Sequence, residues 1–384
     1  MGSAALAGMR PLANAAAQTL PVAGAWPAEA ATRFTAPRPI AAVRADPDRL
    51  VDVAVCTRPF RAQGPRIEAE QRHGKHIVHH YGHGGSGWSL SWGSAHTALA
   101  LILAGRSQHI AVIGCGAIGL TTARVAQDAG LKVRIYCKEL AAQAPSSRAT
   151  GLWTPESRIC TSEFATPEFT QRWIAMTRQS FKTYQSLLGL PGEPVQWRDG
   201  YALSDVPFEQ LPDGLPNEPD YPDLNALVAD LRPHSVELAP GTHPFRVAHV
   251  RRFTQMVFNI ASYQRLLLDD FLRNGGEITH REFTHEHELA TLPERTVVNC
   301  TGYGARALFG DDTITPVRGQ TARLIPQLEV DYVLMYRGHN VAMVPRHEGL
   351  LIQAQGEHDF GNDDAAPDRA LSEAAVQRLA GLFA

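Results

Sequence analysis

Two patterns of hydrophobic positions divide the chain into expected strands and helices. Short apolar runs bounded by turn residues predict strands at 51–55, 75–80, 109–113, 133–136, 197–203 and 296–299. Apolar residues at helical spacing predict helices at 95–104, 120–128, 164–189, 263–274 and in the last 14 residues. Between residues 321 and 353, further short runs alternate like the strands of an antiparallel sheet. We therefore expect an α/β protein that also contains an antiparallel or mixed sheet.

Three glycines follow the strand at 109–113 in a spacing that is typical of dinucleotide-binding turns. They form a Gly-x-Gly-x-x-Gly turn before the helix at 120–128, and Glu139 lies 20 residues beyond the last glycine. Such glycines permit a tight turn, let the backbone approach a pyrophosphate and pack the helix on the strand, while the helix N-terminus stabilises the phosphate charge. The motif predicts a Rossmann-type dinucleotide site but does not distinguish FAD from NAD. Its residues are Gly114, Gly116, Ala117, Ile118 and Gly119.

Composition and charge argue against several classes of protein, namely those that bind nucleic acid, span a membrane or hold a metal ion. The 384 residues are 44% hydrophobic and 20% charged with a formal net charge of -3, so no basic footprint for nucleic acid is present. No apolar run approaches the roughly 20 residues that span a bilayer. The five cysteines lack CxxC spacing and the sixteen histidines lack HExxH or comparable spacing, so we expect buried thiols and no metal.

Residues 1–48 are rich in Ala and Pro and are expected to form an extended arm. Their start lacks the basic head and the apolar stretch of about 7–15 residues that a signal peptide needs. A cytoplasmic location is therefore favoured, an exported mature form stays open, and a homodimer is one option for the oligomeric state.

Several segments resemble one flavoenzyme family, the D-amino acid oxidases. The stretch Ser146-Ser-Arg-Ala-Thr-Gly-Leu-Trp-Thr-Pro155 is similar to the turn that leads that family's chain past the phosphates of FAD to the flavin ring. Segments 297–302 and 316–320 are similar to paired core segments of the family. Arg58-Pro-Phe-Arg61 and the glycine loop at 81–87 are similar to its last portion.

The resemblance implies a Rossmann-type FAD-binding domain joined to a substrate domain on a mixed or antiparallel sheet. It places the FAD-binding domain at 60–155 and 245–315, and the substrate domain at 49–59, 156–244 and 316–384.

The order of the segments departs from the family. There, the Arg-Pro-x-Arg segment and the glycine loop come last, whereas here they come first. The family chain would continue into them after Pro345-Arg346 and the final helix. We predict a circular permutation with one unchanged site, because chain ends can move to surface loops without changing the contacts.

The resemblance also implies roles for single residues. Arg58 would pair with the substrate α-carboxylate, a task that suits a planar guanidinium, and the Gly85 carbonyl would accept from the substrate amine. Alternatives are a surface salt bridge for Arg58 and simple packing for Ser89, which matches a threonine that contacts the flavin pyrimidine. Ser146 and Ser147 match phosphate contacts, and Lys138 and Glu139 would lie near the adenosine ribose. Further FAD contacts are implied for Gly84, Gly85, Ser86, Gly87, Trp88, Gly151, Leu152, Trp153 and Gly302.

Two active-site tyrosines of the family are missing here, since Gly338 and Ala342 stand at the matched positions. Tyr336 and His339 are nearby and are our candidates to replace them, so we expect a different pocket or lid. His83 in the glycine loop is a candidate base, although a hydrogen bond that shapes the loop is the favoured interpretation.

The expected reaction is oxidation of a D-amino acid by hydride transfer from its α-carbon to FAD. The imino acid then hydrolyses to a 2-oxo acid and ammonia, and dioxygen reoxidises the flavin to give hydrogen peroxide. Alternatives are a flavin amine oxidase or dehydrogenase for glycine, sarcosine, an imino acid or D-aspartate, and a flavoprotein without oxidase activity. An NAD-dependent dehydrogenase is disfavoured because the Trp153 turn and the loop at Tyr81 would have no role in it.

Overall fold

The computed structural model describes residues 39–212 and 214–383. Met1–Pro39 and Ile40–Ala384 form separate units, and the second unit contains every element described below. Most of the arm predicted at 1–48 lies outside the described residues. Its described end forms a 3-10 turn at Pro47–Arg49, where the Asp46 side chain accepts a hydrogen bond from the Asp48 N–H.

A six-stranded sheet has the order β2-β3-β10-β4-β5-β9. Neighbouring strands from β3 to β9 are parallel, and β2 pairs antiparallel with β3 at one edge. Its central strands β10 and β4 are buried at every position except His109, as expected for a sheet covered on both faces. The strands are β2 (Arg66–Arg72), β3 (Lys75–Tyr81), β4 (His109–Ile113), β5 (Lys132–Cys137), β9 (Glu277–His280) and β10 (Thr296–Asn299).

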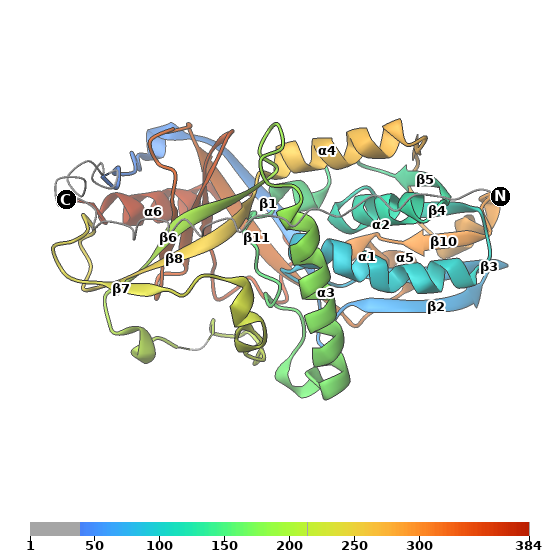
Figure 1. Cartoon of the computed structure of the whole chain (residues 1–384), viewed down its shortest axis with the longest axis horizontal. Coiled ribbons are helices and arrows are strands. Elements are labelled where there is room, and N and C mark those ends of the chain that lie inside the picture. Colours follow the sequence, from blue (N-terminus) through green and yellow to red (C-terminus); the bar gives the residue numbers. More distant parts are fainter. Residues whose placement is uncertain (1–38, 213, 384) are drawn as a thin grey trace, which may run out of the picture. The chain divides into compact units, whose positions relative to one another are not determined.

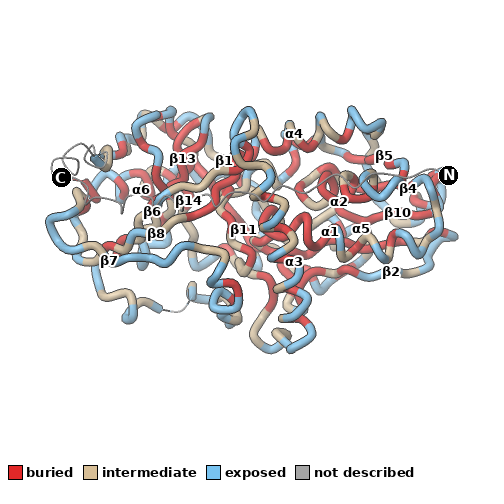
Figure 2. The backbone as a smooth tube through the Cα atoms, viewed as in Figure 1, coloured by how far each residue is buried: buried red, intermediate tan, exposed pale blue. Residues whose placement is uncertain are grey.

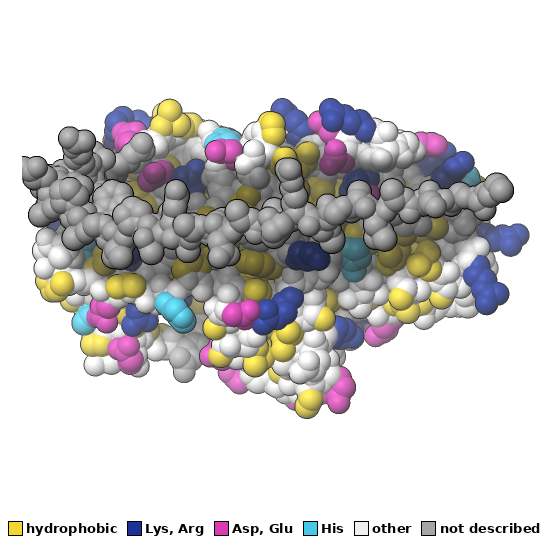
Figure 3. Space-filling model, viewed as in Figure 1, with side chains coloured by type: hydrophobic (Ala, Val, Ile, Leu, Met, Phe, Trp, Pro, Cys, Tyr) yellow, Lys and Arg dark blue, Asp and Glu magenta, His cyan; other side chains and the backbone are white. Residues whose placement is uncertain are grey.

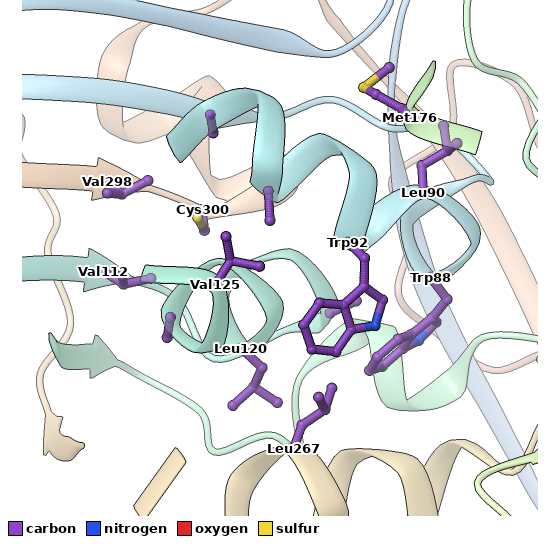
Figure 4. Close-up of a cluster of buried hydrophobic side chains, with 14 of the residues drawn as sticks. Trp88, Leu90, Trp92, Val112, Leu120, Val125, Met176, Leu267, Val298 and Cys300 are labelled. Carbon is purple, nitrogen blue, oxygen red and sulfur yellow. The ribbon is translucent and has the colours of Figure 1, made fainter. Parts of the chain in front are cut away.

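Four helices pack beside this sheet as a layer (Figure 1). They are α1 (Gly87–Ala104), α2 (Ala117–Asp128), α3 (Pro167–Gln185) and α4 (Ile260–Arg273). α1 contacts both α2 and α3, and α2 also contacts α4. Figure 4 shows Trp88 and Trp92 of α1 projecting toward Leu267 of α4, and all three belong to one buried hydrophobic cluster. Burial of such an apolar face supplies most of the stability of helices this long.

The second sheet has eight strands in the order β1-β11-β14-β13-β12-β6-β8-β7. All neighbours are antiparallel except β12 and β6, so the sheet is mixed. The helix α6 (Arg369–Ala380) packs on β14. The strands are β1 (Leu50–Arg61), β6 (Val195–Ser204), β7 (Val236–Leu238), β8 (His249–Phe258), β11 (Ile314–Leu324), β12 (Val333–Tyr336), β13 (Val341–Arg346) and β14 (Gly349–Ala354). Figure 2 shows that burial is concentrated in the strands and in α1 and α2, whereas β7 is largely exposed.

Most predicted elements are present, with three differences. The strand expected at 51–55 continues to Arg61, and α1 begins at Gly87 rather than at residue 95. Small, buried residues such as Ser91 and Ala95 let α1 pack closely from its first turn, so the helix includes part of the predicted loop. β8 was not among the predicted strands, and it belongs to the eight-stranded sheet. All five cysteines are free, and the prediction of buried thiols is confirmed for every one except the half-buried Cys56.

Candidate active site

One large cavity of about 1350 Å³ is lined by residues of both sheets and of the helical layer. Its volume exceeds the 300–1,000 Å³ that is typical of small-ligand pockets, which leaves room for a dinucleotide and a substrate together. Most predicted site residues meet on its wall, although they come from distant parts of the chain. They are Arg58, Gly84, Gly85, Gly87, Trp88, Gly114, Gly116, Ala117, Ile118, Lys138, Glu139, Ser146, Gly151, Leu152, Gly302 and Tyr336.

The glycine turn between β4 and α2 needs glycine at two positions for steric reasons. Gly114 has φ +107°, and a Cβ there would lie 2.6 Å from the carbonyl oxygen of Cys300. A Cβ at Gly119 would lie 2.1 Å from the Gly114 oxygen, so α2 touches the turn itself. Gly119 therefore packs α2 on the turn, as the motif predicts, and does not line the cavity.

Ser146 joins the glycine turn to α1. Its hydroxyl accepts a hydrogen bond from the Ala117 N–H at 3.0 Å, and its carbonyl accepts one from Trp88 Nε1 at 2.9 Å. A hydroxyl at the first turn of α2 is well placed for an anion, since the helix N-terminus carries partial positive charge. Lys138 and Glu139 follow β5 on the same wall, with Lys138 Nζ 3.8 Å from a carboxylate oxygen of Glu282.

The glycine loop after β3 is fastened at two points. The Gly84 N–H donates to the Pro59 carbonyl at 2.9 Å, and the Gly85 N–H donates to the Ser157 carbonyl at 3.0 Å. The first bond holds the loop against β1, and the second ties it to the segment before Arg158. Gly85 and Arg58 both line the cavity.

Arg58 is a guanidinium without a carboxylate partner among residues 39–212 and 214–383. Its Nη1 donates to the Arg318 carbonyl at 2.8 Å, and its Cζ lies 2.7 Å from the place of a Cβ on Gly319. The side chain is half-buried, and this burial lowers the pKa of Arg58. A bound carboxylate would supply the missing counter-charge.

His83 stands behind the glycine loop in a buried polar network. Its Nε2 lies 2.9 Å from the Ser94 hydroxyl, which His80 Nε2 also approaches to 2.8 Å. Burial lowers the pKa of His83 to about 3, so its imidazole is neutral near pH 7. These contacts support the loop-shaping interpretation. His83 Nδ1 is buried with no hydrogen-bond partner in the described part of the chain.

Several predicted site residues do not reach the cavity. The Trp153 ring is fully buried in the core with Arg232 Cζ 4.7 Å from it, and the Ser89 hydroxyl accepts from the Thr154 N–H at 2.8 Å. Both side chains are thus used to fix the 152–154 segment rather than to face a cofactor. The predicted residues away from the wall are Ser86, Ser89, Gly119, Ser147, Trp153 and His339.

Tyr336 and His339 both contact the carboxylate of Asp205. The Tyr336 hydroxyl donates to Asp205 at 2.8 Å, and His339 Nε2 lies 3.0 Å from the same oxygen. Tyr336 lines the wall, but its hydroxyl is already satisfied.

Sequence reasoning missed part of the wall. Arg158 and Glu218 form a buried ion pair there, and Tyr221 lies beside them. Glu218 and Tyr221 fall in the Pro- and Asp-rich stretch 204–243, which has no periodicity that would reveal which side chains point inward. The one signal that would have indicated this part of the wall is the pairing of Arg158 with Glu218, which lies 60 residues later in the chain.

In residues 39–212 and 214–383, no three His, Cys, Asp or Glu side chains gather closely enough to hold a metal ion. None of the described helices is both long and apolar enough for a bilayer crossing. On the face drawn in Figure 3, described acidic and basic side chains are interspersed, in agreement with the small net charge.

Comparison with known proteins identifies the family. Residues 109–384 match the family model described as FAD dependent oxidoreductase. This chain belongs to that family. It is 29% identical over 276 residues to a D-amino-acid oxidase of Rubrobacter xylanophilus, which covers 71% of this chain and 76% of the relative. It is 45% identical over 108 residues to a D-aspartate oxidase of Talaromyces thermophilus, 27% of this chain and 28% of the relative.

Among solved structures, a glycine oxidase from Bacillus cereus has a similar fold. The TM-score is 0.50 at 14% identity, over 72% of this chain and 78% of that one. The predicted fold, an FAD-binding region with a substrate region on a mixed sheet, is therefore confirmed for this oxidoreductase. The predicted domain boundaries stay predictions.

The cavity of this oxidoreductase fits FAD. The turn at Gly114 leaves no room for a side chain, and the Ser146 hydroxyl lies at the N-terminus of α2 on the same wall. Ser146 and the backbone after Gly114 would hold the pyrophosphate, while the glycine loop and residues 151–152 would line the flavin.

The matched region begins at residue 109, after Arg58 and the glycine loop. Both segments nevertheless enter the same sheets, because β1 pairs with β11 and β3 lies parallel to β10. Helix α6 also contacts Pro47–Arg49, next to the start of β1. These neighbours support the permuted order, which stays our prediction.

Proposed function

We propose that this FAD-dependent oxidoreductase oxidises a D-amino acid to the imino acid and returns the electrons to dioxygen as hydrogen peroxide. One observation carries the proposal: Arg58 is a half-buried guanidinium on the cavity wall that forms no ion pair with a carboxylate of any described residue. A planar guanidinium binds a carboxylate through two parallel hydrogen bonds, and the α-carboxylate is the group that all amino acids share.

The residues of the chain would orient the substrate. Arg58 would hold the α-carboxylate, and the Gly85 carbonyl would accept a hydrogen bond from the amine, which fixes the direction of the α-hydrogen. When bound, the flavin of FAD supplies the hydride acceptor. His83 is neutral near pH 7 and hydrogen-bonded to Ser94, so it would shape the loop rather than remove a proton.

The visible spectrum of the purified protein tests the proposal. We expect flavin bands that bleach anaerobically with D-alanine but not with L-alanine, and stoichiometric peroxide in air. Glycine and sarcosine serve as competing substrates in the same assay. Bleaching by a secondary amine but by no D-amino acid would replace the proposal with an amine oxidase, and bleaching by none of them would leave a flavoprotein without this activity.

A further inference from the structure

Arg158 and Glu218 form a bidentate ion pair in the cavity wall. Arg158 Nε donates to Glu218 Oε2 at 2.9 Å and Nη2 donates to Oε1 at 2.5 Å, with side chains only 10% and 4% exposed. Nη2 also approaches Gln355 Oε1 at 3.4 Å. Removing two charges from water can cost more free energy than their attraction returns, so the pair is weak evidence for stability.

The backbone of Arg158 is held in an unusual conformation. Its φ is +50°, in the left-handed region that a residue with a side chain rarely adopts. The Gly85 N–H bond to the Ser157 carbonyl and the contact of Gly84 with the Arg158 carbonyl keep it there. Arg158 is thus positioned by the same two glycines that adjoin Arg58.

The loop that carries Glu218 is fastened on both sides. Asn217 Nδ2 donates to the Glu357 carbonyl at 3.1 Å, and the Ser162 N–H donates to the Asp220 carbonyl at 3.0 Å. The Tyr221 ring meets Phe60 edge-on at 5.8 Å. Phe60 lies two residues beyond Arg58 on β1, so both side chains leave the same face of the strand.

The charges of the pair also reach Arg58. Arg158 lowers the pKa of Arg58 and Glu218 raises it, after the larger effect of burial. Arg58, Arg158 and Glu218 line one cavity, and the bond from the Gly85 N–H to the Ser157 carbonyl ties the segment of Arg158 to the glycine loop. The pair therefore lies in the space open to the side chain of an amino acid whose α-carboxylate Arg58 holds. Tyr221 lines the same wall, and its hydroxyl is buried beside Glu218 and Arg158.

We propose that Arg158, Glu218 and Tyr221 form the subsite for the substrate side chain, and that Glu218 makes it select uncharged polar side chains over carboxylates. This inference rests on the proposed function. Glu218 already fills the Nε and Nη2 edge of the guanidinium, and a second substrate carboxylate would face the charge of Glu218 in a poorly solvated space. Like charges so placed cost several kcal/mol. A hydroxyl or amide would instead donate to Glu218 and accept from Arg158 or Tyr221.

D-Asparagine and D-aspartate test the subsite, because they have nearly the same shape and differ in charge. We expect the native holoenzyme to have the higher kcat/KM with D-asparagine. Glu218→Gln keeps the size of the side chain and removes its charge, and should shift the ratio of kcat/KM toward D-aspartate by at least about tenfold. An unchanged ratio, or a native preference for D-aspartate, would overturn the inference.

Asp230→Asn is the matched control. Asp230 also forms a bidentate pair, with Arg178 at 2.7 and 2.8 Å, but both side chains are exposed and away from the cavity. The same loss of one charge should leave the substrate ratio unchanged. A shift as large as that of Glu218→Gln would assign the effect to net charge and overturn the subsite.

A second variant covers the case in which Glu218→Gln does not fold with FAD. Replacing both Arg158 and Glu218 with Leu leaves no unpaired charge and should move preference from D-asparagine to D-leucine by at least about tenfold. An unchanged ratio would again overturn the inference alone. Failure of the native enzyme to oxidise any D-amino acid would instead remove the proposed function, and the subsite with it.

Discussion

Trp88 Nε1 donates a hydrogen bond to the carbonyl oxygen of Ser146 at 2.9 Å. The bond joins the helix that follows the glycine loop to the turn that caps α2, although the two residues are 58 positions apart. Ser146 in turn accepts from the Ala117 N–H. The two glycine-rich segments are therefore connected through one residue, Ser146.

Trp88→Phe should weaken FAD binding while keeping an aromatic ring in the core. One lost hydrogen bond is worth about 0.5–1.5 kcal/mol, or roughly a 2- to 13-fold higher Kd. Titration of the apoprotein with FAD, followed by fluorescence, measures this. Trp92→Phe is the control, since Trp92 Nε1 bonds the Tyr263 hydroxyl in the core and does not line the cavity. Equal Kd values for both variants would contradict the role given to Trp88.

Arg58→Ala should lose at least about 2 kcal/mol in substrate recognition, roughly a 30-fold higher apparent KM for a D-amino acid. The cause is the loss of the guanidinium that faces the cavity without a partner. Steady-state peroxide formation measures the change, and FAD content shows whether the variant is folded. Arg178→Ala, an exposed surface arginine, should behave like the native protein. A native-like KM for Arg58→Ala would remove Arg58 from the site.

Because His83 is buried, we expect the free energy of unfolding to depend on pH. Its folded-state pKa of about 3 lies below the usual 6.5, so between these values the unfolded chain binds a proton that the folded protein does not. The free energy of unfolding should therefore fall with decreasing pH by up to about 1.4 kcal/mol per unit, or about 2 kcal/mol between pH 6.5 and 5. Urea unfolding at several pH values measures the slope.

His83→Asn should reduce that slope by the contribution of one proton. His358→Asn is the matched control, because the His358 side chain is 83% exposed. If both variants kept the native slope, His83 would not be the group that titrates.

Gly119→Ala should destabilise the protein by about 1–3 kcal/mol and lower its FAD content, because the new Cβ would lie 2.1 Å from the Gly114 carbonyl oxygen. Differential scanning calorimetry of the holoprotein measures the change. Gly356→Ala is the control, since nothing lies within 4 Å of its Cβ position and its φ is not positive. A native Tm for Gly119→Ala would show that the turn can open.

Tyr336→Phe should change kcat/KM by less than about threefold. The Tyr336 hydroxyl is bound to Asp205 at an exposed position, and such contacts contribute under about 1 kcal/mol. Steady-state kinetics with a D-amino acid measures the effect, with Val341→Ala of the same wall reporting loss of packing alone. A decrease above tenfold for Tyr336→Phe only would show that its hydroxyl turns to the substrate.

Local patterns predicted much of this structure. The turn from Gly114 to Gly119 is recognisable because steric limits at two backbone positions require glycine whatever surrounds them. Apolar runs such as 109–113 and 296–299 were found because central parallel strands are buried on both faces. For His83, the sequence favoured a hydrogen bond that shapes the loop, and its Nε2 lies 2.9 Å from the Ser94 hydroxyl.

The direction of individual side chains was not predictable in the same way. Trp153 lies in a motif that resembles a flavin contact, yet its ring packs in the core because its strand-like backbone pairs with Met256. Ser89 was expected in a loop and lies on α1, whose start depends on tight packing against α3. The Arg158–Glu218 pair joins two irregular segments, and no periodicity relates them.

The pairing of β1 with β11 has a consequence for biosynthesis. Arg58 bonds to Arg318, 260 residues later in the chain, and the strands pair along their length. At about 5–20 residues per second, a ribosome needs roughly 13–50 s to make the partner strand after β1. During that time β1 presents an unpaired edge, and pairing over such a separation is intrinsically slow. The yield of folded protein on expression should thus depend on the rate of synthesis and on chaperones more than on the stability of the finished fold.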